Sequence, residues 1–96
     1  MNLRILTSAL QDLQAGCRFY DLQESGAGDY FLESIFEDID SLPQTAGAHR
    51  KVFGFHRLLA SRFPYAIYYR VNGGEILVFR VLDCRRDPQQ IERDLS

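Results

Sequence analysis

Arginine is the residue type in this chain best suited to binding anions. The 96 residues contain eleven basic side chains, of which ten are arginine and only Lys51 is lysine. A guanidinium binds flat anions through two parallel hydrogen bonds and stacks on aromatic rings, which an ammonium does less well. Four arginines are the candidates for contact with a target: Arg57, Arg62, Arg85 and Arg86. Solvated surface charges that pair with neighbouring acids are the alternative interpretation.

Metal-free cleavage of RNA is one reaction that such cations could serve. It needs a base beside the 2′-hydroxyl, cations that stabilise the phosphorane, and an acid for the leaving oxygen. The proton carriers available are His49, His56, Tyr65 and Tyr68. The net charge of −2 argues against a broad nucleic-acid footprint, because phosphate binding depends on basic charge. We expect no direct sequence-specific binding to DNA.

No residue pattern indicates a metal or a cofactor. Cys17, Cys84, His49 and His56 form no close-spaced pair of the kind that zinc sites use. The two glycines of segment 24–28 lack the lysine and the strand context of a phosphate-binding loop. Local motifs therefore assign no metal, no cofactor and no catalytic residue.

Length and composition place the chain among small globular domains. Ninety-six residues make room for one domain, residues 1–96, and 46% of them are hydrophobic. No apolar run approaches the roughly 18 residues that a membrane helix needs, and the N-terminus does not read as a secretory signal. Cys17 and Cys84 lie far apart, unlike the close-spaced sets of small secreted domains. We expect a cytoplasmic protein with two reduced thiols and no membrane contact.

The two halves of the chain carry opposite charge. Residues 1–48 contain two bases and eight acids, a net charge of −6. Residues 49–96 contain nine bases and five acids, a net charge of +4. The arginine-rich half is therefore the expected recognition half, and the acidic half is expected to lie on solvated helices.

The first half predicts a strand and two helices. Residues 3–6 read as a short strand, and Ser8 with Gln11 fits a capping box at the start of a helix that ends near residue 23. A broad apolar stripe that includes Phe31 and Phe36 predicts a second helix, which Pro43 ends. We expect the ring of Phe36 to lie in the core. The short link predicts that the two helices form an antiparallel hairpin, and residues 43–52 read as a loop.

The second half predicts three strands. Residues 53–60, 65–71 and 75–82 are rich in aromatic and β-branched residues. Asn72-Gly73 is a strong signal for a two-residue hairpin turn, and this register would pair Arg70 with Glu75 across the strands. In the tail, Asp87 followed by Pro88 predicts the start of a short helix.

Both faces of this sheet would be apolar. Two helices can cover one face well, so the second is expected to stay partly open, and an exposed apolar patch commonly marks a partner site. Tyr68, Leu77 and Phe79 are the candidates for that contact. Coverage by the protein's own tail and formation of a homodimer are the alternatives.

The order of elements and three segments carry a family resemblance. The run FPYAIYYRV at 63–71, the run ILVFRVL at 76–82 and the ending Arg85-Arg86-Asp87-Pro88 resemble the RelE/ParE superfamily of toxins from type II toxin–antitoxin modules. The resemblance implies an α+β fold, β-α-α-β-β-β, with an N-terminal helical hairpin packed on one face of a small, mainly antiparallel twisted sheet. It also implies a cognate antitoxin as partner, one that folds as it binds.

Departures from the RelE-like pattern favour the ParE-like branch. RelE-like members cut messenger RNA on the ribosome and place an arginine where Ala66 stands, lysines on the preceding strand, and a tyrosine or histidine in the tail. This chain has Leu58-Leu59 on that strand and Gln90, Ile91 and Glu92 in the tail, although Arg86 fits. We therefore expect a toxin that inhibits DNA gyrase by binding and is not an enzyme. The alternatives are a ribosome-dependent endoribonuclease that uses Arg57, Arg86 and a histidine, and a non-toxic member that acts only as an interaction protein.

Overall fold

The computed structural model describes residues 1–96 and contains one five-stranded sheet with the strand order β1-β5-β4-β3-β2. The elements along the chain are β1 (Asn2–Ile5), α1 (Thr7–Gln23), α2 (Ala27–Asp40), α3 (Leu42–Thr45), β2 (Lys51–Val52), β3 (Phe55–Leu59), β4 (Tyr65–Asn72), β5 (Glu75–Asp83) and α4 (Pro88–Leu95). β1 runs parallel to β5, and all other neighbours are antiparallel. The predicted α+β fold is confirmed, and α3 and β2 are added in the segment that was expected to be a loop.

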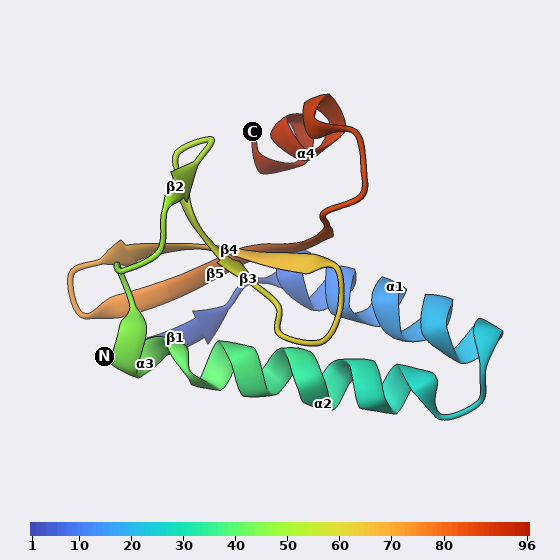
Figure 1. Cartoon of the computed structure of the whole chain (residues 1–96). Helices are drawn as coiled ribbons and strands as arrows, with labels where there is room; N and C mark the ends of the chain where they lie inside the picture. Colours follow the sequence, from blue (N-terminus) through green and yellow to red (C-terminus); the bar gives the residue numbers. More distant parts are fainter.

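The α1–α2 hairpin covers one face of the sheet (Figure 1). Phe31, Ile35 and Ile39 of α2 are fully buried against strand residues such as Ile67 and Val78. The two helices approach closely at Gly28, where an added Cβ would stand 2.5 Å from the carbonyl oxygen of residue 17. Any larger residue at this position would push the helices apart.

The ring of Phe36 is not in the core, so that expectation is wrong. Its side chain is 37% exposed, whereas Phe31 is fully buried. The apolar stripe of α2 is wider than the face that contacts the sheet, and Phe36 lies at its edge, where it lines an open groove against Leu10 and Cys17 of α1.

The capping box expected at the start of α1 is also wrong. The N-cap is Leu6, and no side chain caps the helix. The hydroxyl of Ser8 instead donates to the carbonyl of Phe79, 2.6 Å away on β5. Since Leu6 still donates its N–H to Val78, the chain passes from β1 into α1 directly, and Ser8 serves the sheet rather than its own helix.

The β4–β5 hairpin turns one residue later than expected. Asn72 pairs with Glu75 and Arg70 pairs with Leu77, so the predicted Arg70–Glu75 pair is wrong. The two-residue loop consists of glycines 73 and 74, and Gly73 supplies the positive φ of 61°. A glycine pair meets the demand of a tight turn as well as Asn-Gly does, which is why the sequence signal was off by one position.

A bulge on β5 changes the face of the sheet to which the side chains after it point. Tyr69 pairs with Val78 but Tyr68 pairs with Arg80, which leaves Phe79 unmatched. Val81 consequently lies in the core under the helical hairpin and Leu82 lies on the opposite face. Strict alternation from the Asn72-Gly73 turn predicts the reverse, with Leu82 on the face of Val78 and Val81 on the face of Phe79, and that prediction is wrong.

The same bulge lets one carboxylate bind β5 from α1. Asp12 accepts two hydrogen bonds from the guanidinium of Arg80, both 2.8 Å long, and a third from the N–H of Val81 at 2.9 Å. Arg80 also donates to the carbonyl of Asp94 in α4 at 2.7 Å. One arginine therefore joins elements on both sides of the sheet.

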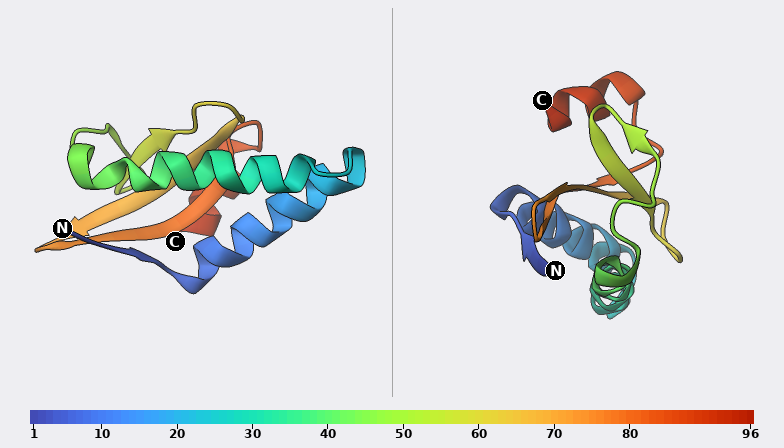
Figure 2. Two further views of the ribbon diagram at one scale, coloured as in Figure 1. Left: turned by 90° about the horizontal axis from the view of Figure 1, so that it is seen from below. Right: turned by 90° about the vertical axis from the view of Figure 1, so that its left-hand side faces the viewer.

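The second face of the sheet is covered in part by α4, as in the alternative that places the protein's own tail there, and a groove stays open beside this helix. Asp87 caps the helix by accepting from the N–H of Gln89 at 3.0 Å, and Pro88 occupies its first turn, as predicted. Ile91 inserts into a second apolar cluster and is only 6% exposed. Its partners are Phe55, Ala66, Tyr68 and Leu82. The sheet thus lies between the α1–α2 hairpin and α4 (Figure 2).

A matched pair of substitutions tests the orientation of α2. Phe31→Ala should lower the free energy of unfolding by about 3–5 kcal/mol, because it opens a cavity among fully buried residues. Phe36→Ala should cost less than about 1.5 kcal/mol, since that ring is already partly in water. Urea denaturation followed by circular dichroism measures both values, and equal losses would contradict the burial described above.

The Asp12–Arg80 contact is tested by a double-mutant cycle. Asp12→Ala should destabilise the protein by about 3 kcal/mol, because it leaves a poorly solvated guanidinium without its carboxylate. The double variant Asp12→Ala, Arg80→Ala should lose less than the sum of the single losses. Glu33→Ala, an exposed acid on α2, is the control and should change stability by no more than about 0.5 kcal/mol. Additive losses would mean that the pair does not couple.

Candidate functional site

Three of the four candidate arginines gather at one end of the sheet. Tyr65 at the start of β4 pairs with Asp83 at the end of β5, and Cys84 donates its N–H to the carbonyl of Pro64 at 2.8 Å. The connection before β4 carries Arg62, and the segment after β5 carries Arg85 and Arg86. The structure therefore brings together three side chains that are up to 24 positions apart.

Each of these three arginines is paired with a carboxylate. Arg62 lies 2.8 Å from Glu37 and Arg85 lies 2.7 Å from Asp83. Hydrogen bonds from Arg85 hold the pKa of Asp83 below its ordinary value. Exposed ion pairs contribute little to stability, about 0–1 kcal/mol. An anionic partner can therefore displace Glu37 from Arg62 at small cost, whereas Asp83 is only 20% exposed and accepts two side-chain hydrogen bonds from Arg85.

Arg86 has a structural partner as well. Its guanidinium lies 2.8 Å from Asp94, whose carboxylate is only 18% exposed. Asp94 is also the residue whose carbonyl accepts from Arg80. Arg86 therefore helps to hold α4 on the sheet, and its replacement is expected to disturb the fold more than replacement of Arg85.

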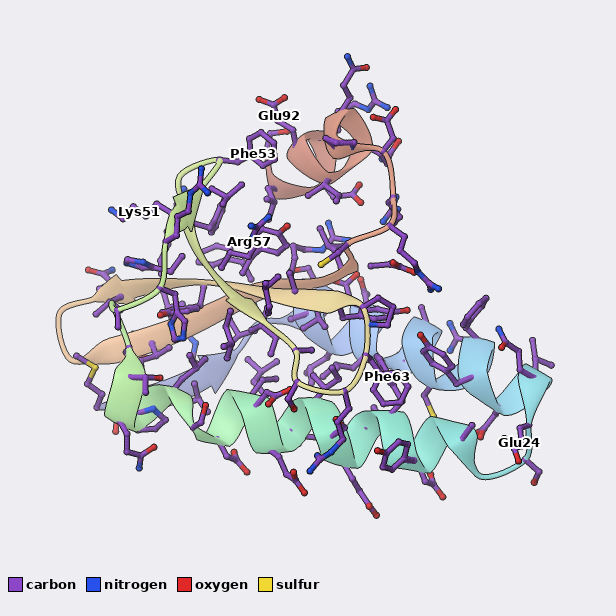
Figure 3. All side chains as sticks on the ribbon, in the orientation of Figure 1. Glu24, Lys51, Phe53, Arg57, Phe63 and Glu92 are labelled. Atoms are coloured by element: carbon purple, nitrogen blue, oxygen red, sulfur yellow. The ribbon has the colours of Figure 1, made fainter.

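The fourth arginine, Arg57, lies apart from the other three. It stands opposite Tyr68 in the middle of β3, on the side of the sheet that faces α4 (Figure 3). No carboxylate lies within 4.0 Å of it. Burial raises the pKa of Tyr68 and of Cys84, and the nearby charge of Arg57 works against both shifts. The thiol and the phenol consequently stay protonated near neutral pH.

The two histidines that RNA cleavage could use as proton carriers are not assembled beside the cations. His49 contacts the hydroxyl of Tyr69, and His56 donates through Nδ1 to the carbonyl of His49 at 2.7 Å. His56 also stacks on the ring of Tyr69, which belongs to the core under the helical hairpin. Successive strand residues point to opposite faces, so His56 and Arg57 lie on opposite sides of the sheet.

Tyr65 is equally unsuited to act as a base. Burial raises its pKa to about 12, whereas an efficient general base has a pKa near the working pH. The set proposed for an endoribonuclease, Arg57 and Arg86 with a histidine, is therefore not brought together in this structure.

The candidates for antitoxin contact differ in accessibility. Tyr68 is only 2% exposed beneath α4, while Leu77 and Phe79 are half-buried. Phe79 packs edge-on against Phe55, with ring centroids 5.1 Å apart. A groove of about 600 Å³ opens here between β3, β5 and the end of α4. Contact of these three residues with an antitoxin stays a prediction.

Sequence reasoning missed Arg70 as a member of this groove. The guanidinium of Arg70 lies over the ring of Phe55, 4.0 Å from its centroid, and 5.4 Å from that of Phe79. The mistaken hairpin register assigned Arg70 to Glu75 and hid this contact. The available signal was compositional, because no Asp or Glu occurs between residues 41 and 74.

The structure offers no arrangement for a metal ion or a membrane span. No three His, Cys, Asp or Glu side chains are grouped closely enough to bind a metal, and both cysteines are free thiols. None of the helices combines the length and the apolar character that crossing a bilayer requires.

The fold and the arginine-bearing end of the sheet define a toxin of the RelE/ParE superfamily. A family model described as the ParE toxin of the type II toxin–antitoxin system parDE matches residues 3–88. The chain belongs to this ParE toxin family, and membership implies a cognate antitoxin as partner.

A solved structure supports the same assignment. The chain is similar to the chromosomal ParDE TA system from P. aeruginosa, with 27% sequence identity and a TM-score of 0.77. The similarity covers 84% of this chain and 92% of that chain. No sequence among the curated proteins matches this chain.

The docking of α4 is tested by placing a charge in its interface. Ile91→Asp should detach α4, because a carboxylate cannot be buried among Phe55, Tyr68 and Leu82 without large cost. Binding of the dye ANS should rise several-fold, and the pKa of Tyr68 should fall towards its ordinary value as the burial that raises it is lost. Fluorescence and tyrosinate absorbance measure the two effects. Glu92→Gln, an exposed change on the same helix, should alter neither, and an Ile91→Asp variant that behaves like this control would contradict the contact.

Proposed function

We propose that this ParE-family toxin acts by binding DNA gyrase and inhibiting it, without cleaving a substrate. The observation that carries the proposal is the placement of both histidines on the face of the sheet opposite Arg57, with Tyr65 and Tyr68 held protonated by burial. The cations thus lack a histidine or another base beside them, and contact with a protein is the function that they can still perform.

The target surface would be the arginine-bearing end of the sheet. Arg62 and Arg85 are both exposed, and the carboxylate partner of Arg62 is exposed and exchangeable as well. A guanidinium forms two parallel bonds with a carboxylate, so a target that offers acidic side chains can take over each pair with defined geometry. Arg86 would contribute at the same end while its contact with Asp94 persists.

The antitoxin would use the groove beside α4. Phe79 lines this groove and Arg70 provides a cation at its wall, while the half-buried Leu77 lies two residues before Phe79 on β5. Tyr68 becomes accessible only if α4 moves away. A segment that folds as it binds suits such an open groove, because it can follow a surface formed by several elements.

Separate substitutions of the two neighbouring arginines test the proposal. Arg85→Ala should weaken inhibition of gyrase supercoiling by about tenfold or more, the usual loss for a charge-assisted contact, and should leave antitoxin affinity unchanged. Arg86→Ala should weaken inhibition and also lower the melting temperature, because Asp94 loses its partner. Arg93→Ala, an exposed arginine of α4, is the control.

Two results would contradict the proposal. Supercoiling by gyrase would be unaffected by the purified wild-type protein, or primer extension after induced expression would reveal new cuts in messenger RNA. The second result would favour a ribosome-dependent nuclease, and normal growth after induction would favour a non-toxic interaction protein.

A further inference from the structure

The β2–β3 hairpin carries a cluster of unpaired cations. Residues 41–74 contain five bases and no acid, and the fold places four of these bases on or beside this hairpin. They are Arg50, Lys51, Arg57 and Arg70. None of the four has a carboxylate within 4.0 Å, whereas five other arginines of the chain do. The cluster is therefore free to attract an external anion.

An aromatic ring stands at the tip of this hairpin in a strained conformation. Val52 pairs with Phe55, so Phe53 and Gly54 form the turn, with φ values of 53° and 83°. Two positive φ values define a type I′ turn, whose first position favours Asn, Asp or Gly. Phe53 is the only non-glycine residue of the chain with positive φ. Strain of this kind persists where function requires the side chain.

The ring of Phe53 makes no packing contact that would offset the strain of its backbone. Its side chain is 43% exposed, and no aromatic partner lies against it. Figure 3 shows it at the tip of the hairpin, beyond Lys51 and Arg57. A strained, exposed aromatic ring at the tip of a hairpin that also carries arginine has the composition of an interface hot spot.

The hairpin is held firmly against the rest of the sheet. Arg70 donates through Nε to the carbonyl of Gly54 at 3.3 Å, and its guanidinium lies over the ring of Phe55. Arg57 donates its N–H to the carbonyl of Arg50 at 2.9 Å. The tip is therefore a pre-organised projection, which lowers the entropic cost of binding.

We propose that the tip of the β2–β3 hairpin binds an acidic segment of the protein that this toxin inhibits, with Phe53 as the apolar anchor and Arg50 and Arg57, which lie opposite each other on one face of the hairpin, as the partners of its carboxylates. The proposal rests on the proposed function, because the acidic segment would belong to the protein that the toxin inhibits, and Arg57 is one of the four candidates for target contact. It adds the chemistry of the partner and the residue at the centre of the interface.

A protein segment suits this surface better than a nucleic acid does. The cationic patch is bounded by acids, since α4 beside it carries Glu92 and Asp94, and α2 on the other side of the sheet carries five acids and no base. A nucleic acid repeats its charge along its whole length and would meet these carboxylates. A short acidic segment can end where the cations end.

Replacement of the strained ring separates binding from folding. Phe53→Asn creates Asn-Gly, the preferred type I′ turn, so the melting temperature should stay equal or rise while affinity for purified gyrase falls at least tenfold. Leu59→Asn is the matched control. It removes the apolar side chain of Leu59 at the end of β3, which is 57% exposed, and should change affinity less than twofold. Surface plasmon resonance with immobilised gyrase measures the affinities.

Charge reversal tests the cations in the same assay. Arg50→Glu should weaken gyrase binding at least tenfold, whereas Arg18→Glu, the same change on the exposed side of α1, should weaken it less than twofold. Antitoxin affinity should be unchanged in every variant. If Phe53→Asn and Arg50→Glu bind gyrase like the wild type while Arg85→Ala does not, the hairpin proposal is wrong and the proposed function stands.

Other outcomes identify a different occupant. Failure of the wild-type protein to bind gyrase would overturn the proposed function and this inference together. An equal loss of antitoxin affinity in Phe53→Asn would assign the hairpin to the antitoxin. Fluorescence anisotropy with a labelled single-stranded oligothymidine provides the remaining arm, since binding by the wild type that is lost in Phe53→Asn would assign the hairpin to nucleic acid.

Discussion

The contact between Asp12 and Arg80 is the constraint on which the architecture depends. A small sheet with two apolar faces needs helices packed on both sides. This ion pair joins the α1–α2 hairpin and α4 to the strand that lies between them. Asp12 belongs to α1, Arg80 to β5, and the carbonyl that Arg80 also binds belongs to α4. The bulge at Phe79 makes the arrangement geometrically possible, because it releases the N–H of Val81 towards Asp12. Both groups are mostly withdrawn from water, so each depends on the other for its solvation.

The uneven distribution of charge along the chain becomes a division in space. The acids of the first half lie largely on α2, on one side of the sheet, and the acid-free segment builds the hairpin that stands on the other side (Figure 1). Ion pairs with neighbouring carboxylates then divide the cations into two groups. Arg62, Arg85 and Arg86 are neutralised by neighbours, whereas those around the β2–β3 hairpin are not. The charge that a partner meets is thus decided by local pairing more than by the net charge of the chain.

Periodicity and resemblance predicted the elements better than their details. The two long helices, the meander of strands and the Asp87 cap follow from patterns that local physics enforces. The errors arose where two local solutions were equally good: glycines 73 and 74 replaced Asn72-Gly73 in the turn, and an apolar stripe wider than its contact left Phe36 at the edge. The docking of α4 could not be predicted from its own sequence, because Ile91 and Leu95 are the only residues of this helix that pack in the second apolar cluster. Resemblance identified the family, but the strained conformation of Phe53 could not be predicted, because the composition of the segment does not reveal a positive φ at that residue.

The parallel pairing of β1 with β5 has a consequence for how the toxin is made. Asn2 finds its partner at Glu75, and Ile5 finds its partner at Val78. The first strand to leave the ribosome therefore waits for one of the last, and such long-range closure is slow compared with helix formation. The nascent chain cannot complete its sheet until nearly all of it has been synthesised. An antitoxin that is already present in the cell would meet the toxin molecule when the toxin has just folded and first becomes active.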